Sequence, residues 1–524
     1  MSIPVIDIFA GPGGLGEGFS SVLNDNGERV FKTVLSIEMD IYAHQTLELR
    51  SLFRQFSPSA VPDEYYCFLR SELSRQILFE HFPIEAEAAR NEAWHAKLGY
   101  ENDCAASDEV DSRINKALKG EKNWILLGGP PCQAYSIVGR SRLKRKILNP
   151  IIDHRVELYK QYLRILAYHN PLVFVMENVK GILSSKTEKV NVFEKILSDI
   201  KDPVAACKEE NKSENKFLEC PGYDIYPLAP SNKHGETLKP TDFVIRSEQF
   251  GIPQARHRVI IIGIRKKTGL RFKKISPSKS EIAVSQVLNG LPELRSGISR
   301  GVVDNAENWF EIISKAPSQQ FFKSIDTKVA DLIKKIALNG FQGKYERGSD
   351  FIETDKVSID YPDKEWFLDD KMAGVANHNA RSHMKSDLYR YLFVSAYGAV
   401  HGMSPTLSDF PDELLPKHKN VLDGIIQKKF ADRFRVQIST VPSRTITSHI
   451  SKDGHYYIHP DPKQCRSLTV REAARIQTFP DNYFFCGPRT SQYVQVGNAV
   501  PPLLAKKIAN HIKNILEEHN GETT

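Results

Sequence analysis

Short runs of β-branched and other apolar residues recur through the first half of this sequence, at residues 5–9, 33–37, 124–127, 172–176 and 259–264. Unbroken apolar runs of this length are typical of strands buried on both faces of a parallel sheet. Segments with helical periodicity, such as residues 155–168, lie between them. This alternation of strands and helices predicts a doubly wound α/β domain.

The chain has 524 residues, more than one hydrophobic core usually organises. Beyond residue 265 the strand pattern gives way to a long stretch rich in basic and aromatic residues, and from residue 492 a glycine turn precedes a helix begun by Pro501 and Pro502. We expect an α/β domain at 1–268, a smaller second domain at 269–490, and a segment at 491–524 that packs back on the first domain. Two polar stretches, 71–120 and 201–216, are interpreted as surface elaborations.

Composition narrows the class of protein. Hydrophobic residues make up 41% and charged residues 26%, which excludes a mainly disordered chain, and the net charge of +7 permits a polyanionic partner without demanding one. The start lacks the pattern of a signal peptide and no apolar run could span a bilayer, so we expect a cytoplasmic protein without a membrane partner. Seven cysteines without C-x-x-C spacing argue against a disulfide framework or a zinc knuckle, and no metal site is expected.

A glycine-rich turn follows the first apolar run directly. Residues 11–16 read GPGGLG and fit the spacing G-x-G-x-x-G, which lets the backbone approach a ligand at the start of a helix. Glu38 ends the second run about twenty residues further on, where a carboxylate can accept hydrogen bonds from ribose hydroxyls. Nicotinamide and flavin enzymes share this spacing, so the pair predicts a cofactor that contains a nucleoside without naming it.

Three further motifs follow or precede later strands. The third run ends in GGPPCQAYS at residues 128–136, the fourth ends in ENVKG at 177–181, and QARHR at 254–258 leads into the fifth. Taken singly, Cys132 could be an inert packed thiol, Glu177 a surface residue, and Arg256 and Arg258 solvated charges. Because ligands bind at the carboxyl ends of parallel strands, their shared position at strand ends favours one site.

In this order, DIFAG at 7–11, PCQ at 131–133, ENV at 177–179 and QARHR at 254–258 resemble the cytosine-5 DNA methyltransferase family. LTVREAARIQTFPD at 468–481, QVGNAVPP at 495–502 and RTIT at 444–447 extend the resemblance over nearly the whole chain, apart from its variable middle. The resemblance implies a Rossmann-like S-adenosylmethionine-dependent methyltransferase domain, followed by a smaller DNA target-recognition domain. It also implies a bacterial enzyme of a restriction–modification system.

The resemblance assigns roles to the residues quoted above. Cys132 matches the thiolate that adds to cytosine C6, Glu177 the carboxyl group that contacts N3 and the exocyclic amine, and Arg258 the residue at the O2 edge. Arg256 matches a second arginine that either favours the thiolate or holds the catalytic loop closed. The implied contacts to S-adenosylmethionine are Phe9, Gly11, Gly13, Gly14, Gly16, Glu38, Met39, Pro131, Asn498 and Ala499.

Such chemistry requires double-stranded DNA with the target cytosine flipped out of the stack. The basic run at 140–146 follows Cys132 and would clamp phosphates, while residues 271–440 resemble the target-recognition region by position, basicity and length. The capping-box pattern at 469–472 predicts the start of an architectural helix. We expect a monomer near the nucleoid, with a cognate restriction endonuclease as functional partner.

Other classes explain less of the sequence. A nicotinamide or flavin oxidoreductase leaves Cys132, Glu177 and the two arginines without a role. A zinc nucleobase deaminase is favoured only by HGE at 234–236, which fits H-x-E without the second cysteine motif. A non-catalytic DNA-binding regulator on the same scaffold remains an alternative because fold does not fix function, and so does methylation of RNA.

Overall fold

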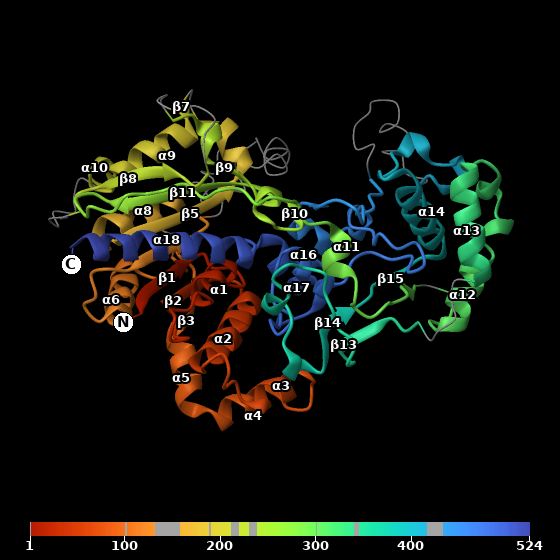
Figure 1. Ribbon diagram of the computed structural model, residues 1–524, viewed down its shortest axis with the longest axis horizontal. Coiled ribbons are helices and arrows are strands. Elements are labelled where there is room, and N and C mark those ends of the chain that lie inside the picture. The colour runs from red at the N-terminus through yellow and green to blue at the C-terminus, as the bar shows by residue number, and fades with distance from the viewer. Residues whose placement is uncertain are drawn as a thin grey trace.

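The computed structural model describes residues 2–99, 102–130, 158–187, 190–210, 220–229, 238–299, 301–339, 345–416 and 433–523 (Figure 1). In these ranges the largest sheet has the strand order β3-β2-β1-β4-β5-β11-β8, with β9 also paired to β11. Its strands are β1 (Ile3–Ile8), β2 (Phe31–Glu38), β3 (Ala93–His95), β4 (Ile125–Gly128), β5 (Val173–Val179), β8 (Tyr223–Pro227), β9 (Val244–Arg246) and β11 (His257–Arg265).

All five predicted strands are present, but the prediction that they are parallel is wrong for the fifth. Strands β1 to β5 run parallel to one another, whereas β11 is antiparallel to both of its neighbours, β5 and β8. An apolar run indicates that a strand is buried but not whether it runs parallel to its neighbours, since its direction depends on the connection that leads into it. The α/β class is confirmed, and the sheet is mixed.

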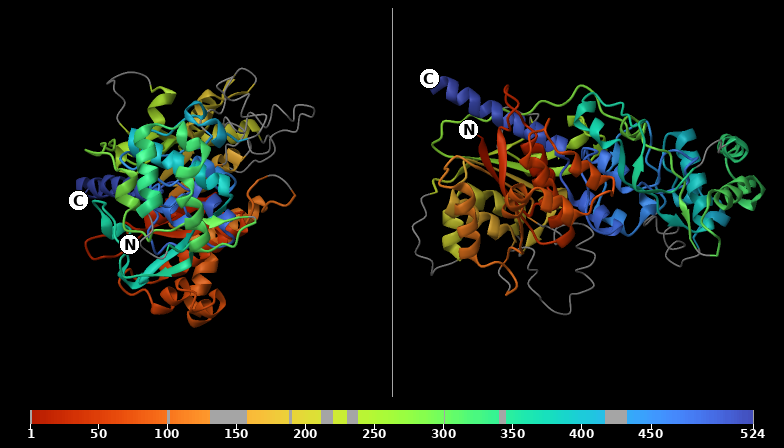
Figure 2. Two further views of the ribbon diagram at one scale, coloured as in Figure 1. Left: turned by 90° about the vertical axis from the view of Figure 1, so that its right-hand side faces the viewer. Right: turned by 90° about the horizontal axis from the view of Figure 1, so that it is seen from below.

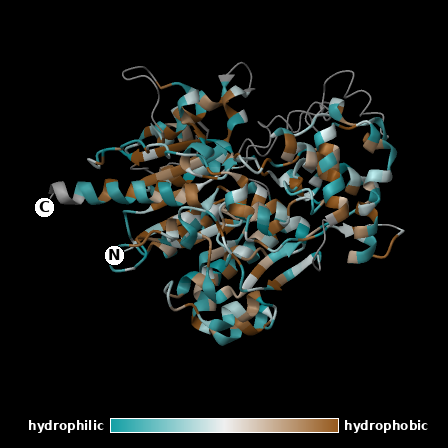
Figure 3. Ribbon diagram, turned by 45° about the vertical axis from the view of Figure 1, so that its right-hand side comes forward, coloured by the Kyte–Doolittle hydropathy of each residue, from teal (hydrophilic) through white to brown (hydrophobic). Residues whose placement is uncertain are grey.

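Successive residues of each strand face opposite sides of the sheet. Val5, Leu127 and Val175 face one hydrophobic cluster, which includes side chains of α1 (Gly14–Ser20) and α18 (Pro502–Thr523). Their neighbours Ile6 and Leu126 face a second cluster. That second cluster contains residues of α6 (Ser107–Leu118), α8 (Leu158–His169) and α9 (Val192–Lys201). Helices therefore cover both faces, as a doubly wound domain requires, and the long C-terminal helix carries both brown and teal residues in Figure 3.

The interpretation of residues 71–120 as a surface elaboration is wrong. The segment contributes β3, which pairs with β2 through Ser36 and Ala93, and α6, whose Val110 and Ile114 are buried against the sheet. The many charged residues of the segment occupy the outward faces of these elements and mask the buried stripe. Helices α2 (Ile41–Gln55), α3 (Asp63–Leu69), α4 (Arg75–His81) and α5 (Pro83–Glu92) pack nearby.

The C-terminal helix α18 packs on the sheet domain. A Cβ atom at Gly18 of α1 would lie 2.4 Å from the Ala505 Cβ of α18, so the two helices are in close contact. Figures 1 and 2 show both chain termini at the same end of the molecule, opposite α12 (Ala306–Ser314) and α13 (Thr327–Asn339). The end of α18 thus lies far from α12 and α13.

A separate hydrophobic cluster lies within residues 298–465. It is built on α12, α13 and α14 (Lys385–His401), with buried Trp309, Ile333 and Leu392. A two-stranded sheet of β13 (Gly348–Glu353) and β14 (Gly374–Asn379) lies between this cluster and the main sheet (Figure 1). The second lobe therefore has a core of its own.

Residues on either side of that lobe return to the core of the main sheet. Buried Val287 from α11 (Val284–Leu288), Ile446, and Ala473 from α16 (Val470–Ile476) belong to the same cluster as strands β1 and β4. The predicted capping box of α16 is confirmed, since the amide of Glu472 donates to Thr469 Oγ1 (3.2 Å) and the amide of Thr469 donates to Glu472 Oε2 (2.8 Å). The chain also forms helices α10 (Pro203–Glu210) and α17 (Arg489–Asn498).

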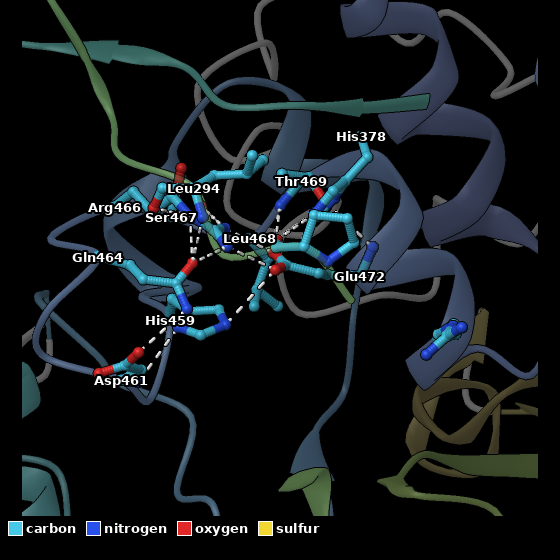
Figure 4. Close-up of polar contacts among 12 residues, drawn as sticks. Leu294, His378, His459, Asp461, Gln464, Arg466, Ser467, Leu468, Thr469 and Glu472 are labelled. Carbon is cyan, nitrogen blue, oxygen red and sulfur yellow. Dashed lines mark hydrogen bonds and ion pairs between the residues drawn. The ribbon is translucent and has the colours of Figure 1, made fainter. Parts of the chain in front are cut away.

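Glu472 is also the centre of a buried polar network that joins the lobes (Figure 4). It accepts hydrogen bonds from Arg466 Nη1 (2.7 Å) and Nη2 (2.6 Å), and His459 Nε2 lies 3.4 Å from Glu472 Oε1. Burial acts to raise the pKa of Glu472, but the charged Arg466 guanidinium holds it well below its usual value. His378 joins the network through Thr469 Oγ1, 2.8 Å from its Nδ1. The joint is therefore a set of paired buried charges and not only an apolar contact.

Candidate active site

The glycine-rich turn links the end of β1 to the start of α1. Gly13 has a φ of 90° and caps α1, and a Cβ atom at Gly14 would lie 2.2 Å from the carbonyl oxygen of Val500. Glycine is required at the first position by the left-handed backbone and at the second by the approach of the C-terminal segment. The turn therefore brings residues 499 and 500 beside the start of α1.

Glu38 ties the turn to the end of the second strand. Its Oε2 accepts a hydrogen bond from the amide of Gly11 (2.8 Å), and its Oε1 accepts one from the amide of Asp40 (2.8 Å). Burial raises the pKa of Glu38, and the two amides oppose that shift. The carboxylate is thus fixed in place at the edge of the sheet.

A cavity of about 420 Å³ opens at this edge, over the carboxyl ends of the parallel strands. Of the residues predicted to contact a cofactor, those that line it are Phe9, Gly11, Gly14, Glu38, Met39, Asn498 and Ala499. Gly13 and Gly16 do not line it, because the first caps α1 and the second donates its amide to Asp7 Oδ2 (3.2 Å). Pro131 and Cys132 lie outside the described residues.

Some cavity residues had no role in the sequence prediction. Asp7 is buried, and its Oδ1 has no hydrogen-bond partner within the described ranges. Burial raises the pKa of Asp7 to about 7, although the amide of Gly16 opposes the shift. The quoted motif at 7–11 contained Asp7, but only the fold shows that its carboxyl group reaches the cavity.

A second unpredicted part of the wall comes from the segment after β3. Ala96, Lys97 and Leu98 line the cavity, and Lys97 Nζ forms an ion pair with Asp103 at 2.9 Å. The sequence offered no signal for this, because the short strand that precedes these residues lies inside a polar stretch. Tertiary pairing of β3 with β2 is what places them there.

The reactive end of the site is formed by strands β5 and β11. Arg258 Nε lies 2.8 Å from Glu177 Oε1, and the two side chains are 14% and 13% exposed. Burial lowers the pKa of Arg258, and Glu177 opposes this shift by favouring the charged guanidinium. The sequence predicted both residues, and the structure brings them together as an ion pair on the wall of the cavity, where Glu177 is part of the lining.

The chain that precedes Cys132 passes beside this pair. A Cβ atom at Gly129 would lie 3.2 Å from Glu177 Oε2, and Pro130, the last described residue before the gap, also lines the cavity. Asn178 Nδ2 donates to the carbonyl oxygen of Pro130 (3.4 Å). Gly129 and Pro130, which precede Cys132 in the chain, therefore lie beside the Glu177 side chain.

Arg256 does not form part of this ion pair. It is 1% exposed, and it donates through Nη1 to the carbonyl oxygen of Ile446 (2.7 Å) and through Nη2 to that of Gly497 (3.2 Å). Burial lowers the pKa of Arg256 well below its usual value, and Arg258 adds to the effect. In the described part of the chain, Arg256 therefore links the start of β11 to the segments that contain Ile446 and Gly497.

No group of three or more histidine, cysteine or acidic side chains within the described ranges is placed to hold a metal ion. No helix in the same part of the chain is long and apolar enough to cross a membrane.

Comparison with known proteins finds similar sequences over most of the chain. The model of one protein family, described as C-5 cytosine-specific DNA methylase, matches residues 81–203 and 241–514. The type II methyltransferase M.Bpa9945I of Bacillus paralicheniformis is 32% identical over 533 aligned residues, which cover 98% of this chain and 100% of that protein. The DNA (cytosine-5-)-methyltransferase M.ApeKI of Aeropyrum pernix is 26% identical, over 76% of this chain and 83% of its own length. M.DdeI of Desulfomicrobium norvegicum, a type II methyltransferase, is 24% identical over 98% and 90%.

Proposed function

This chain belongs to the C-5 cytosine-specific DNA methylases and is a DNA (cytosine-5-)-methyltransferase of restriction–modification type, and we propose how its residues carry out the reaction. The proposed methyl donor is S-adenosylmethionine, and the substrate is a flipped-out cytosine in a specific double-stranded DNA sequence. The observation that carries the proposal is the Glu177–Arg258 ion pair on the cavity wall, beside the chain that leads to Cys132.

The cavity fits this cofactor by its chemistry. The glycine turn lets backbone approach a ligand closely, the Glu38 carboxylate can accept hydrogen bonds from ribose hydroxyls, and Met39 offers an exposed apolar surface to a base. Asp7 Oδ1 is a buried acceptor that an ammonium group would satisfy. When bound, S-adenosylmethionine supplies an electrophilic methyl group on a sulfonium.

The chain's own residues would prepare the base for methyl transfer. Cys132 Sγ bonds to C6 as a thiolate, and the electron pair displaced from the C5–C6 bond makes C5 a nucleophile. Glu177 contacts N3 and the exocyclic amine, and Arg258 binds the O2 edge, so both stabilise the charge that the addition pushes into the ring. After C5 takes the methyl group, loss of the C5 proton to a base restores the ring and the Cys132–C6 bond breaks.

Recognition of DNA is assigned to residues 269–490. The separate hydrophobic core within 298–465 supports this assignment, because a lobe with its own packing can vary its surface without disturbing the sheet. The basic run at 140–146, which would contact phosphates, lies outside the described residues. We expect a monomer, with a cognate restriction endonuclease as functional partner.

The test is transfer of labelled methyl groups to duplex DNA by the purified chain, with Cys132→Ala as the variant. We expect the parent to methylate cytosine C5 and Cys132→Ala to lose turnover while it still binds DNA. Cys207→Ala on α10 is the matched control and should keep full activity. Turnover that survives in Cys132→Ala would refute the adduct, and a parent that binds DNA without any transfer would favour the non-catalytic regulator.

A duplex that carries 5-fluorocytosine at the target supplies a second readout. Fluorine cannot leave as the C5 proton does, so the parent should remain covalently attached to this DNA. An active enzyme that forms no such complex would contradict thiolate addition.

A further inference from the structure

A second cavity lies at the opposite end of the sheet from the cofactor cavity. It has a volume of about 1060 Å³ and is bounded by the amino ends of β1 and β2, the carboxyl ends of α1 and α2, and α18. Cationic side chains of Arg29, Lys32, Arg54 and Lys513 line it. None of these residues has a role in the chemistry proposed above.

The innermost cation is Arg54. Its side chain is 6% exposed, and its Nη2 pairs with Glu92 Oε1 at 2.5 Å, while its Nη1 lies 3.5 Å from Glu17 Oε2. Its Nε has no hydrogen-bond partner among the described residues. A buried guanidinium with a free donor is costly, and a bound acceptor would remove that cost.

The charges around Arg54 do not balance. Glu17 is already shared with Arg50, whose Nη2 lies 2.5 Å from Glu17 Oε1, and Glu92 is taken by Arg54 itself. Arg29 is the third guanidinium of this group, and the described residues offer it a carbonyl oxygen, that of Ser20 (2.7 Å), but no carboxylate ion pair. Burial lowers the pKa of Arg29 to about 10, partly opposed by Glu17, and repulsion from Arg54 and Arg50 adds to the shift. Glu28 and Glu517 also line the cavity, so with Glu92 three carboxylates face the four cationic side chains, and one positive charge is left for a ligand.

The rest of the cavity fits an organic molecule better than a lone ion. Its volume is that of a site for a small organic ligand. Hydroxyl groups of Ser20 and Thr33, 2.9 Å apart, lie on one wall, and Leu23 and Leu516 supply apolar surface. Lys32 is exposed at the cavity and adds a further cation.

We propose that this cavity binds a small phosphate monoester, with the phosphate held between Arg29 and Arg54 and the organic part against the polar and apolar walls. Arginine pairs with phosphate oxygens through two parallel hydrogen bonds, and Nε and Nη1 of Arg54 have no hydrogen-bond partner among the described residues. The site is distinct from the cofactor cavity because Arg54 and Lys513 lie at the other end of the strands. Its occupancy does not depend on the methyltransferase mechanism.

Calorimetric titration of the full chain with glucose 6-phosphate tests the proposal, and unphosphorylated glucose is the matched ligand. A sugar phosphate is chosen because, unlike an adenine nucleotide, it does not imitate the proposed cofactor. Glucose 6-phosphate should bind and glucose should not. Arg29→Gln should weaken binding at least about tenfold, because a charge-assisted contact is lost.

The control variant is Arg70→Gln, at a surface arginine paired with Glu72 outside the cavity, and it should bind like the parent. If Arg29→Gln does not fold, binding of glucose 6-phosphate is measured on Lys32→Gln. Lys32 is exposed, so this variant should fold, and loss of its charge should also weaken binding. Absence of binding to the parent, equal binding of glucose, or unchanged affinity in folded Arg29→Gln or in Lys32→Gln would overturn the proposal.

Discussion

At the scale of single residues, two arginines separated by one position have different surroundings. Arg258 pairs with the carboxylate of Glu177 on the cavity wall, whereas Arg256 is enclosed and donates to backbone carbonyl groups of Ile446 and Gly497. The sequence motif places both on the same side of an extended strand and does not show that their surroundings differ. The short irregularity between β10 (Gln254–Ala255) and β11 separates their directions.

Substitution of each arginine by lysine should separate the two roles. Arg258→Lys should lower kcat by roughly 100-fold with little change in stability. The planar guanidinium donates hydrogen bonds to the charge that develops in the reaction, and lysine cannot reproduce this geometry. Arg256→Lys should lower the free energy of unfolding by about 1–3 kcal/mol, since one ammonium group cannot satisfy both buried carbonyl groups. Methyl-transfer kinetics and urea unfolding of both variants provide the measurement, and the reverse pattern would contradict this division.

At the scale of elements, the glycine turn and α18 form one structural unit. The sequence predicted the turn and the C-terminal helix separately, and correctly, because both depend on local signals such as glycine spacing and proline at a helix start. Their contact is not local. Gly14 and Val500 are brought together only by the packing of α18 on α1.

Gly14→Ala tests this contact. The added Cβ atom would lie 2.2 Å from the carbonyl oxygen of Val500, so backbone must move, and we expect a loss of about 1–3 kcal/mol in stability together with weaker binding of the methyl donor. Gly16→Ala is the control, since its Cβ atom would lie 3.3 Å from Asp7 Oδ2 and requires only a small adjustment. Thermal unfolding and cofactor titration compare the two. Equal behaviour of both variants would show that the close approach to Val500 is unimportant.

At the scale of the whole molecule, three buried histidines lie in and beside the second lobe. Burial lowers the pKa of His378 to about 4 and that of His383 to about 3, and it also lowers the pKa of His459. The hydrogen bonds of His378 fit the neutral ring, since Nε2 donates to the carbonyl oxygen of Pro292 (2.9 Å) and Nδ1 accepts from the Thr469 hydroxyl (2.8 Å). Protonation would break the second contact (Figure 4).

The protein should therefore lose stability on mild acidification. The unfolded chain binds protons at these three histidines below about pH 6.5 while the folded chain does not, and Asp7, whose raised pKa acts in the opposite direction, offsets only one of them. The free energy of unfolding therefore falls as the pH drops from about 6.5 towards 4. Each fully titrating histidine contributes about 1.4 kcal/mol per pH unit. Urea unfolding at pH 7 and pH 5 measures the change.

His383→Phe is the matched variant for this measurement. His383 Nε2 is buried without a hydrogen-bond partner in the described part of the chain, and its ring packs against Tyr391 with centroids 4.7 Å apart, so phenylalanine can replace it. The variant should lose less stability between pH 7 and pH 5 than the parent does. An identical pH dependence would show that His383 is not protonated on unfolding.

The sequence by itself determined the α/β class, the strand ends that carry the site, and the family, because each depends on a local pattern of apolar runs, glycines and short motifs. It could not determine the direction of β11, the place of β3 in the sheet, the approach of Lys97 to the cavity, or the separate surroundings of Arg256 and Arg258. Those features depend on contacts between segments up to hundreds of residues apart, such as Arg256 with Gly497. Only tertiary packing decides them, because the free energy of burial depends on which surfaces meet and not on their order along the chain.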